Sequence, residues 1–460
     1  MTRLALVNPS DDRSYYRPAY PSVGLGYLSS FLKSGGFEVL TLDAKFDGIS
    51  LEEARRELLA FQPDILGFSA MTHEIANAAR WAEDIKRLFP EALVLIGGVH
   101  ATVNAEGTLD EFPVFDIAVM GEGEQTLLEI AKSASSGWGL NPLTMKSIKG
   151  IAWRDGDEIR VNSPRDLILD LDILPFPTYD HIKSPIRAYP ILSSRGCPSK
   201  CIFCCRILGD RIRTRSPQNV VDEIRLVQNK SSPELIEICD DTFTLPPSRA
   251  YEICELLIQE NLHEKIRWFA LSRASGVDLE LFHKMKEAGC VKVDFGVESG
   301  NEEILKRIRK GITISEARNA VRMAKEAGLK TGSYFILGHP EETAQTIKDT
   351  INLAVELNCD VVSFGIMVPY PGTRIYDMAV KGECGYRLLS QRWEDYDKQI
   401  GNALEIEGLP RSELERWQRR AYLAFYIRNL RFAELIRLLI SQRRLALSML
   451  RKWANSSPRL

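Results

Sequence analysis

Three closely spaced cysteines are the feature of the sequence best suited to chemistry. Cys197, Cys201 and Cys204 follow a Cys-x3-Cys-x2-Cys spacing. Thiolates are the usual ligands of iron–sulfur clusters, commonly four to a cluster. Three of them leave one iron of a 4Fe–4S cluster open to a small molecule, as catalytic zinc sites keep one position open. A structural zinc site is the alternative, but such sites usually pair two Cys-x2–4-Cys units, and no second pair follows here.

Composition narrows the class of protein around this site. The chain has 460 residues, which suits two or three domains, and its formal net charge of −3 argues against a nucleic-acid partner. The apolar run Leu4–Val7 is too short for a signal peptide, and no stretch approaches the roughly 20 apolar residues of a spanning helix. We therefore expect a cytoplasmic protein, in which nine cysteines serve as thiols or ligands rather than as disulfides.

Residues 1–135 alternate short apolar runs with amphipathic helix patterns. This alternation predicts an α/β fold with an N-terminal doubly wound, Rossmann-like parallel sheet covered by helices on both faces. Such sheets bind ligands beyond the carboxyl ends of their strands. The expected strands are Leu4–Val7, Glu38–Leu42, Ile65–Ser69, Leu93–Ile96 and Ile117–Met120. The expected helices are Gly24–Ser34, Leu51–Ala60, Ile75–Leu88 and Gln125–Ser133.

Residues 136–185 have the character of a linker that docks two domains. It includes a hairpin, Ile148–Trp153 with Glu158–Val161, and a proline-rich extended stretch, Leu171–Thr178. Strand–helix alternation returns over residues 186–385 and predicts a central partial (β/α)6 barrel, a shortened TIM-like barrel. Its expected strands are Tyr189–Ser193, Leu235–Cys239, Arg267–Leu271, Lys292–Phe295, Lys330–Ile336 and Val361–Ile366.

Residues 386–460 have a helical and basic pattern, which predicts a C-terminal helical extension. From Leu409 onward there are 12 Lys and Arg against 3 Asp and Glu. Two amphipathic helices are expected, over Ser412–Asn429 and Arg431–Trp453. They either pack on the barrel with a solvated basic face or lie on anionic lipid as interfacial helices, which would give a peripheral membrane contact.

The cysteine segment resembles the radical S-adenosylmethionine superfamily, and Phe203, directly before the third cysteine, also matches it. In that superfamily the open iron takes the amino and carboxylate groups of S-adenosylmethionine. One electron from the cluster then releases a 5′-deoxyadenosyl radical. The resemblance implies a 4Fe–4S cluster, S-adenosylmethionine, and an external one-electron reductant of the flavodoxin or ferredoxin type.

Polar residues after the next two barrel strands agree with this resemblance. Asp240 and Asp241 follow the second strand, where a carboxylate could hold the ammonium of S-adenosylmethionine. A helix N-cap is an equally good interpretation of an aspartate there. Ser272 and Arg273 follow the third strand and could hold the carboxylate of S-adenosylmethionine.

The later barrel strands carry two further segments similar to superfamily signatures. Gly296–Gly300 follows the fourth strand; its glycines allow close backbone approach, and Glu298 could accept the ribose hydroxyls. Gly338–Glu342 follows the fifth strand, and Gly338 is a candidate cofactor contact or a turn residue.

The N-terminal domain resembles the cobalamin-binding domain that some of these enzymes carry in front of the barrel. The matching segments are Pro21–Leu28, Asp64–Ser69, Gly97–Thr102 and Gly121–Glu124, and with the barrel motifs the resemblance covers roughly residues 1 to 385. It implies bound cobalamin, with glycines leaving room for the nucleotide tail and exposing backbone N–H groups to its phosphate. The candidate contacts are Ser69, Thr72, Gly97, Gly98, His100, Gly121, Glu122 and Gly123.

One departure bears on mechanism. Many cobalamin domains supply a histidine to cobalt from Asp-x-His-x-x-Gly, and none of the six histidines here has that context. We therefore expect no histidine on the lower face of cobalt, and His100 is expected to contact the tail or to be structural. The alternative for this domain is a flavodoxin-like module that has lost its ligand.

Taken together, the resemblance implies a cobalamin-dependent radical methyltransferase. It would move a methyl group from methylcobalamin to an unactivated carbon of a natural-product or lipid-like substrate through a 5′-deoxyadenosyl radical. The alternative is a radical enzyme without methyl transfer (a dehydratase, cyclase, decarboxylase or epimerase) whose cobalamin domain is degenerate or non-methylating. A non-catalytic cobalamin or redox sensor is a third hypothesis, which the intact barrel motifs disfavour.

Overall fold

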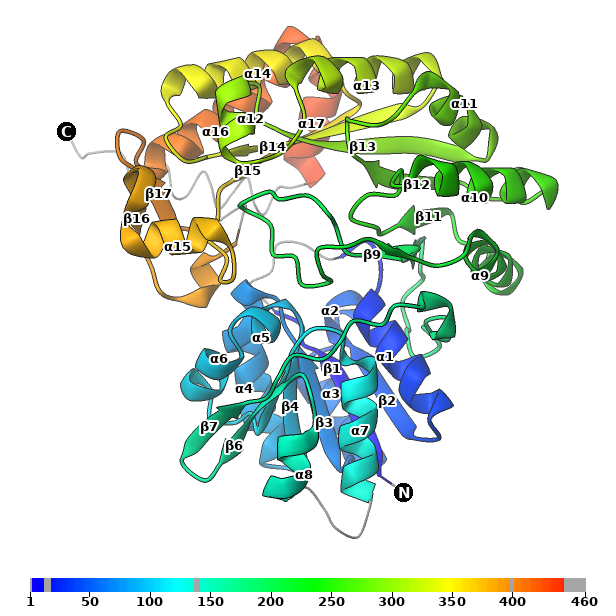
Figure 1. Ribbon diagram of the computed structural model, residues 1–460, viewed down its shortest axis with the longest axis vertical. Helices are drawn as coiled ribbons and strands as arrows, with labels where there is room; N and C mark the ends of the chain where they lie inside the picture. Colours follow the sequence, from blue (N-terminus) through cyan, green and yellow to red (C-terminus); the bar gives the residue numbers. More distant parts are fainter. Residues whose placement is uncertain (1, 12–17, 136–140, 398–400, 442–460) are drawn as a thin grey trace.

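The structure is a computed structural model that describes residues 2–11, 18–135, 141–397 and 401–441. Figure 1 shows two α/β units, with the N-terminal unit in blue and cyan and the second unit in green and yellow. The C-terminal elements, in orange and red, lie beside the second unit.

The N-terminal unit contains a seven-stranded sheet with the order β2-β1-β3-β4-β5-β6-β7, parallel from β2 to β5. Alternate residues of β1 enter two different cores: Ala5 and Val7 pack on one face, Leu4 and Leu6 on the other. The doubly wound sheet is thereby confirmed. Its parallel strands are β1 (Arg3–Asn8), β2 (Glu38–Asp43), β3 (Ile65–Ser69), β4 (Leu93–Gly97) and β5 (Ile117–Val119). Its helices are α1 (Val23–Ser34), α2 (Ala44–Asp47), α3 (Leu51–Phe61), η1 (Thr72–Glu74), α4 (Ile75–Lys86), α5 (Val99–Val103), α6 (Ala105–Glu111), α7 (Gly123–Ser135) and α8 (Pro142–Ser147).

The hairpin expected in the linker is part of this first sheet. Strands β6 (Ile151–Asp155) and β7 (Glu158–Val161) pair antiparallel to each other, and β6 pairs antiparallel to β5. Assigning it to a linker was wrong, because Ile151, Ala152 and Trp153 are all buried and extend the apolar sheet on both faces. The connection between the two sheets therefore starts after Val161 and contains only one short helix, η2 (Leu171–Ile173).

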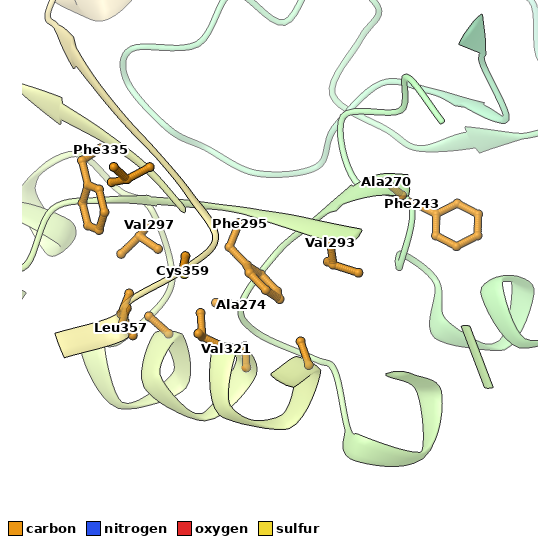
Figure 2. Close-up of a cluster of buried hydrophobic side chains, with 14 of the residues drawn as sticks. Phe243, Ala270, Ala274, Val293, Phe295, Val297, Val321, Phe335, Leu357 and Cys359 are labelled. Carbon is orange, nitrogen blue, oxygen red and sulfur yellow. The ribbon is translucent and has the colours of Figure 1, made fainter. Parts of the chain in front are cut away.

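The second unit contains the expected six parallel strands, in the order β15-β14-β13-β12-β11-β8. Its helices pack against the strand faces through one large core, part of which Figure 2 shows. The strands are β8 (Ala188–Ile191), β11 (Leu235–Ile238), β12 (Trp268–Ser272), β13 (Cys290–Glu298), β14 (Lys330–Leu337) and β15 (Val361–Ile366). The helices are α9 (Pro217–Lys230), α10 (Pro247–Gln259), α11 (Leu279–Glu287), α12 (Glu302–Arg307), α13 (Ile314–Glu326), α14 (Ala344–Leu357), α15 (Arg374–Lys381) and η3 (Glu383–Gly385).

The two long helices of the C-terminal extension begin only at Arg411. Before that, β16 (Tyr386–Leu388) and β17 (Leu404–Ile406) form an antiparallel pair, with η4 (Trp393–Asp395) between them. The helical expectation for this stretch was wrong, because Leu404 and Ile406 are buried on either side of a partly exposed Glu405, which is the period of a strand.

Both expected C-terminal helices are present, as α16 (Arg411–Arg428) and α17 (Phe432–Ser441), and residues 442–453 of the second lie outside the described residues. Helix α16 covers the open edge of β15. The side-chain amide of Gln418 donates to the carbonyl of Phe364 at 2.7 Å, and the Phe364 N–H donates to the Tyr422 hydroxyl at 3.1 Å. Helix α16 thereby satisfies edge groups that would otherwise be open to another strand.

Candidate active site

The three cysteines lie on the loop between the short strands β9 (Ser194–Arg195) and β10 (Arg213–Thr214), directly after β8. Cys201 is buried, Cys197 is half-buried and Cys204 is exposed. Within the described ranges, no three His, Cys, Asp or Glu side chains converge as the ligands of one metal ion would. The ligands of a four-iron cluster need not converge on one point, because each thiolate binds a different iron. Three thiols spaced along one loop therefore suit such a cluster.

Positive charge surrounds the buried cysteine. The hydrogen bond from Cys204, together with the charges of Lys310 and Arg273, lowers the pKa of the Cys201 thiol to about 6. The Lys310 ammonium is 2.8 Å from a Glu298 carboxylate oxygen, and both residues are buried. The same hydrogen bond raises the pKa of the Cys204 thiol, so the environment favours the thiolate, which is the form that binds metal, at Cys201.

Asp240 is held by hydrogen bonds within the protein. Its Oδ1 accepts hydrogen bonds from the N–H groups of Ser193 and Ser194 at 2.6 and 2.9 Å, and its Oδ2 accepts from their hydroxyls at 2.5 and 2.8 Å. The residue is 2% exposed. These four hydrogen bonds hold the backbone turn that leads into the cysteine loop, and the contact with S-adenosylmethionine expected for Asp240 stays a prediction. Asp241 next to it is exposed.

Ser272 and Arg273 are also engaged within the protein. The Ser272 hydroxyl is 2.8 Å from the Thr244 hydroxyl and 2.8 Å from the Arg273 carbonyl. The Arg273 guanidinium donates to the Ser199 hydroxyl and, at 2.7 Å, to the Lys310 carbonyl. Because Ser199 lies between the first two cysteines, Arg273 ties the cysteine loop to the turn at Lys310.

Glu298, Gly338 and Phe203 lie around one buried histidine. Glu298 ends β13 at a register shift with φ +71°, a strained conformation for a residue other than glycine. Its carbonyl is 3.3 Å from Nε2 of His339, and the Phe203 ring centroid lies 6.3 Å from the His339 ring. Gly338, at φ +96°, donates its N–H to Glu342 and accepts from the Tyr386 hydroxyl at 2.9 Å.

The sequence analysis did not identify the charged side chains that line the barrel interior. In Figure 2 Phe295 of β13 points toward the covering helices, and it belongs to the buried core, so its neighbours in the alternation face the barrel interior. There Lys292 and Tyr334 each contact Oδ2 of Asp294 at 2.8 Å. Burial raises the pKa of Glu237 on β11 to about 7, against the charge of Lys292. The period-two pattern of Lys292–Glu298, apolar at every second residue, was the signal for this lining.

Glycine loops follow β4 and β5 in the N-terminal unit. Gly97 ends β4, and Gly98 has φ +94°. The Thr102 hydroxyl donates to the Gly98 carbonyl at 2.8 Å and accepts from the Gly121 N–H at 3.1 Å. The loops after the two strands are therefore tied together. The other predicted residues here are Ser69 at the end of β3, buried Thr72 in η1, and Gly123 at the start of α7.

Replacing Gly98 tests how tightly this loop is built. A Cβ at Gly98 would lie 2.6 Å from the Ala70 carbonyl oxygen, and its φ of +94° strains any other residue. We expect Gly98→Ala to lower the free energy of unfolding by about 1–3 kcal/mol, measured by urea denaturation. Gly24→Ala is the control, because nothing lies within 4 Å of its Cβ position in α1. A destabilisation of Gly98→Ala no larger than that of the control would contradict the strained turn.

His100 is the second residue of α5, which follows these glycines, and its imidazole is fully buried. Neither ring nitrogen has a hydrogen-bond partner among the described residues. The ring packs edge-on against Trp393, with centroids 4.7 Å apart. Burial lowers the pKa of His100 to about 4, so the side chain is neutral. Two orphaned nitrogens in a buried site are costly unless a ligand or water satisfies them.

The pKa of His100 predicts a pH dependence of stability. Its folded pKa of about 4 lies below the ordinary 6.5, so the unfolded chain takes up the proton first as pH falls. The contribution of His100 to the free energy of unfolding is therefore complete above pH 6.5 and is lost toward pH 4. Between pH 8 and pH 5 the loss should be about 2 kcal/mol. In His100→Phe this loss should shrink, read by urea denaturation at both pH values. The exposed His283→Phe is the control, and an unchanged pH slope in His100→Phe would contradict the expectation.

Glu122 lies at the junction of the two units. Its carboxylate accepts from Arg195 at 2.8 Å, from Arg213 at 2.9 Å and from the Ile168 N–H at 2.8 Å. Arg195 also pairs with Glu124 at 2.7 Å, and all four charged side chains are at least 94% buried. The oxygens of Glu122 are occupied by this ion-pair network, and the contact with cobalamin expected for Glu122 stays a prediction.

A large hollow in the described part of the chain lies away from this junction. Its volume is about 810 Å³, and it is lined by Asp64, Lys86, Asp116 and Arg154. Asp64 and Asp116 directly precede β3 and β5, so the hollow lies at the amino ends of the strands. Parallel sheets bind ligands at the opposite edge, and we therefore assign it no part in the site.

Comparison with known proteins agrees with both units. The family described as the radical SAM superfamily matches residues 191–354, and the B12 binding domain family matches residues 15–131. An uncharacterized methyltransferase of Pyrococcus horikoshii is 34% identical over 89% of this chain and 88% of its own. An anaerobic magnesium-protoporphyrin IX monomethyl ester cyclase of Cereibacter sphaeroides is 30% identical over 78% of this chain and 60% of its own.

A solved structure shows the same fold. It is the radical S-adenosylmethionine methyltransferase TsrM of Kitasatospora setae, determined with cobalamin and a 4Fe–4S cluster bound. Its TM-score is 0.75 at 20% identity, covering 92% of this chain and 91% of that one. The chain therefore belongs to the radical S-adenosylmethionine superfamily, in its family of cobalamin-dependent methyltransferases. It is an enzyme with a cobalamin-binding domain in front of a radical barrel.

Proposed function

We propose that the protein transfers a methyl group to an unactivated carbon of a small natural-product or lipid-like substrate. When bound, cobalamin would supply a methyl group that comes from one molecule of S-adenosylmethionine, and the cluster with a second molecule would supply the 5′-deoxyadenosyl radical that removes a substrate hydrogen. One observation carries the proposal: Arg195, two residues before Cys197, pairs with Glu122 in the loop after β5. The ligand-binding edges of both sheets therefore meet at one junction.

On the barrel side, we assign Cys197, Cys201 and Cys204 as the cluster ligands. Glu298 would accept the ribose hydroxyls of S-adenosylmethionine, in the orientation that the ion pair with Lys310 gives it. Asp241 is the carboxylate left for the ammonium group, because Asp240 is occupied. We reassign Ser272, Arg273 and Gly338 to holding the loops around the cofactor.

On the N-terminal side, the residues present suit cobalamin. Gly98 after β4 and Gly121 after β5 present backbone without a side chain at the carboxyl edge of the sheet, and the unpartnered nitrogens of His100 offer one donor and one acceptor. We assign the nucleotide tail to this edge. The residues proposed to line it are Ser69, Thr72, Gly97, Gly98, His100, Gly121 and Gly123.

The substrate and the reductant complete the proposal. Glu237, Lys292 and Asp294 line the barrel interior below the cofactor edge, and they are our candidates for orienting polar groups of the substrate. The electron would come from an external flavodoxin or ferredoxin type of reductant. A cytoplasmic location suits an oxygen-sensitive cluster and nine free cysteines.

One relative favours a second candidate, a radical enzyme without methyl transfer. The Cereibacter sphaeroides protein of 30% identity bears the name of a cyclase. Incubating the reconstituted enzyme with methyl-labelled S-adenosylmethionine, a reductant and a small-molecule extract distinguishes the two. S-adenosylhomocysteine, 5′-deoxyadenosine and a labelled product support methyl transfer. Substrate-dependent 5′-deoxyadenosine with neither label transfer nor S-adenosylhomocysteine would favour the cyclase type.

A further inference from the structure

The C-terminal helices expose an apolar stripe that the rest of the described chain leaves uncovered. Single exposed apolar side chains are normal, but several on successive turns form a patch of the kind that marks a binding surface. We call these six residues the C-terminal stripe. They are Leu423 (47% exposed) and Ile427 (46%) of α16, Leu430 (77%) of the turn, and Phe432 (52%), Ile436 (57%) and Ile440 (65%) of α17.

The stripe residues of α17 lie on one side of the helix, and the turn before the helix is anchored to the barrel. Phe432, Ile436 and Ile440 recur every four residues and so lie on one side of α17. The turn before α17 is anchored, because the Arg431 guanidinium donates to the Cys359 carbonyl at 2.6 Å and lies 5.5 Å from the Phe425 ring centroid. The barrel thereby holds the start of the helix while its apolar side faces outward.

The charge beside the stripe is strongly positive, although the whole chain carries −3. Residues 409–441, all within the described part of the chain, hold seven Arg and no Lys against three Glu and no Asp. Such a surface is complementary to an anionic one. The exposed arginines of the two helices are Arg416, Arg419, Arg420, Arg428 and Arg437.

We propose that the C-terminal stripe is a membrane-binding surface that lays α17 in the headgroup region of a bilayer containing anionic lipid. Apolar side chains flanked by arginines are what an interfacial helix requires, since the former enter the acyl boundary and the latter meet lipid phosphates. In the described part of the chain, no helix has the length and apolar character to cross a bilayer, so the contact is peripheral. The proposal stands independently of the reaction catalysed.

Vesicle flotation of the full, reconstituted chain tests the proposal. We expect the protein to float with phosphatidylcholine vesicles that contain phosphatidylglycerol, to stay behind with pure phosphatidylcholine, and to be released by salt. The variant Phe432→Ser/Ile436→Ser/Ile440→Ser should bind at least about tenfold more weakly. The matched control Leu143→Ser/Val161→Ser/Leu169→Ser, at residues 80%, 51% and 81% exposed in the N-terminal half, should float like the original chain.

A charge variant and two other readouts complete the test. Arg419→Gln/Arg420→Gln/Arg437→Gln should weaken binding about fivefold for each arginine. All variants should keep their iron content and their cleavage of S-adenosylmethionine, which shows that they fold. Failure to float with anionic vesicles, or equal flotation with neutral ones, would overturn the proposal. So would a lipid-free dimer that the triple serine variant dissociates, because the stripe would then be a protein interface.

Discussion

Replacing Cys197, Cys201 or Cys204 with alanine should abolish the cluster and, with it, cleavage of S-adenosylmethionine. Each thiolate would hold one iron, and the fourth iron would take S-adenosylmethionine, so that removal of any one ligand leaves two irons without a protein ligand. We expect iron and sulfide content to fall toward zero after anaerobic reconstitution. 5′-Deoxyadenosine formation should fall to the level without enzyme.

The neighbouring Cys205 provides the control for this experiment. Its sulfur is 3.5 Å from the Pro371 carbonyl, and burial raises the pKa of its thiol to about 11. Cys205→Ala should therefore keep the cluster and its activity. Full iron content in Cys204→Ala, or its loss in Cys205→Ala, would show that the wrong thiols have been assigned.

Replacing Glu122 with alanine should destabilise the protein strongly and allow the two units to unfold separately. The substitution leaves Arg195 with only Glu124 and leaves Arg213 without a carboxylate, both in a buried site. Removing one partner of a buried ion pair costs about 3–5 kcal/mol, because the remaining charge is uncompensated. We expect a large fall in the urea midpoint and two resolved unfolding transitions, read by tryptophan fluorescence and far-ultraviolet circular dichroism.

The pair of Glu129 and Arg165 gives a comparison nearer the surface, in which the Arg165 side chain is 12% exposed. The two side chains are hydrogen-bonded, at 3.0 Å for one of the contacts, and Glu129 is 46% exposed. Glu129→Ala should cost at most about 1 kcal/mol. If Glu122→Ala were no more destabilising than Glu129→Ala, the junction would not be held by the buried network.

The two sheets could be predicted because each of their parallel strands has a recognisable pattern in its own short stretch of sequence. An apolar run such as Leu93–Ile96 needs burial on both faces, and glycines after it mark the ligand edge. The cysteine spacing was equally local. The six barrel strands and the three-cysteine loop therefore lie where expected, within one to three residues at their ends.

Asp240 and Glu122 show where this kind of inference stops. Both are acidic residues just after a strand, the position at which a ligand contact is expected. Their actual partners come from distant segments: Ser193 for Asp240, and Arg195 and Arg213 for Glu122. A carboxylate's role depends on which donors the fold brings to it, and no local pattern records that.

Two predicted element boundaries were wrong for a related reason. The hairpin at Ile151–Val161 was recognised, but its place at the edge of the first sheet depends on pairing with β5, more than 30 residues earlier. The strands around Leu404 are only three residues long, too short for their alternation to compete with the helical pattern that follows. Short strands are fixed by their partners rather than by their own sequence.

Cobalamin content is the most direct test of the central claim. The full chain should be purified without oxygen, reconstituted with iron, sulfide and hydroxocobalamin, and analysed by visible absorption and mass spectrometry. We expect about one cobalamin per chain, with a spectrum that lacks a nitrogen ligand to cobalt, and weaker retention of cobalamin in His100→Phe and Gly98→Ala. A chain that holds its iron–sulfur cluster but retains no cobalamin would contradict the account and leave a radical enzyme without methyl transfer.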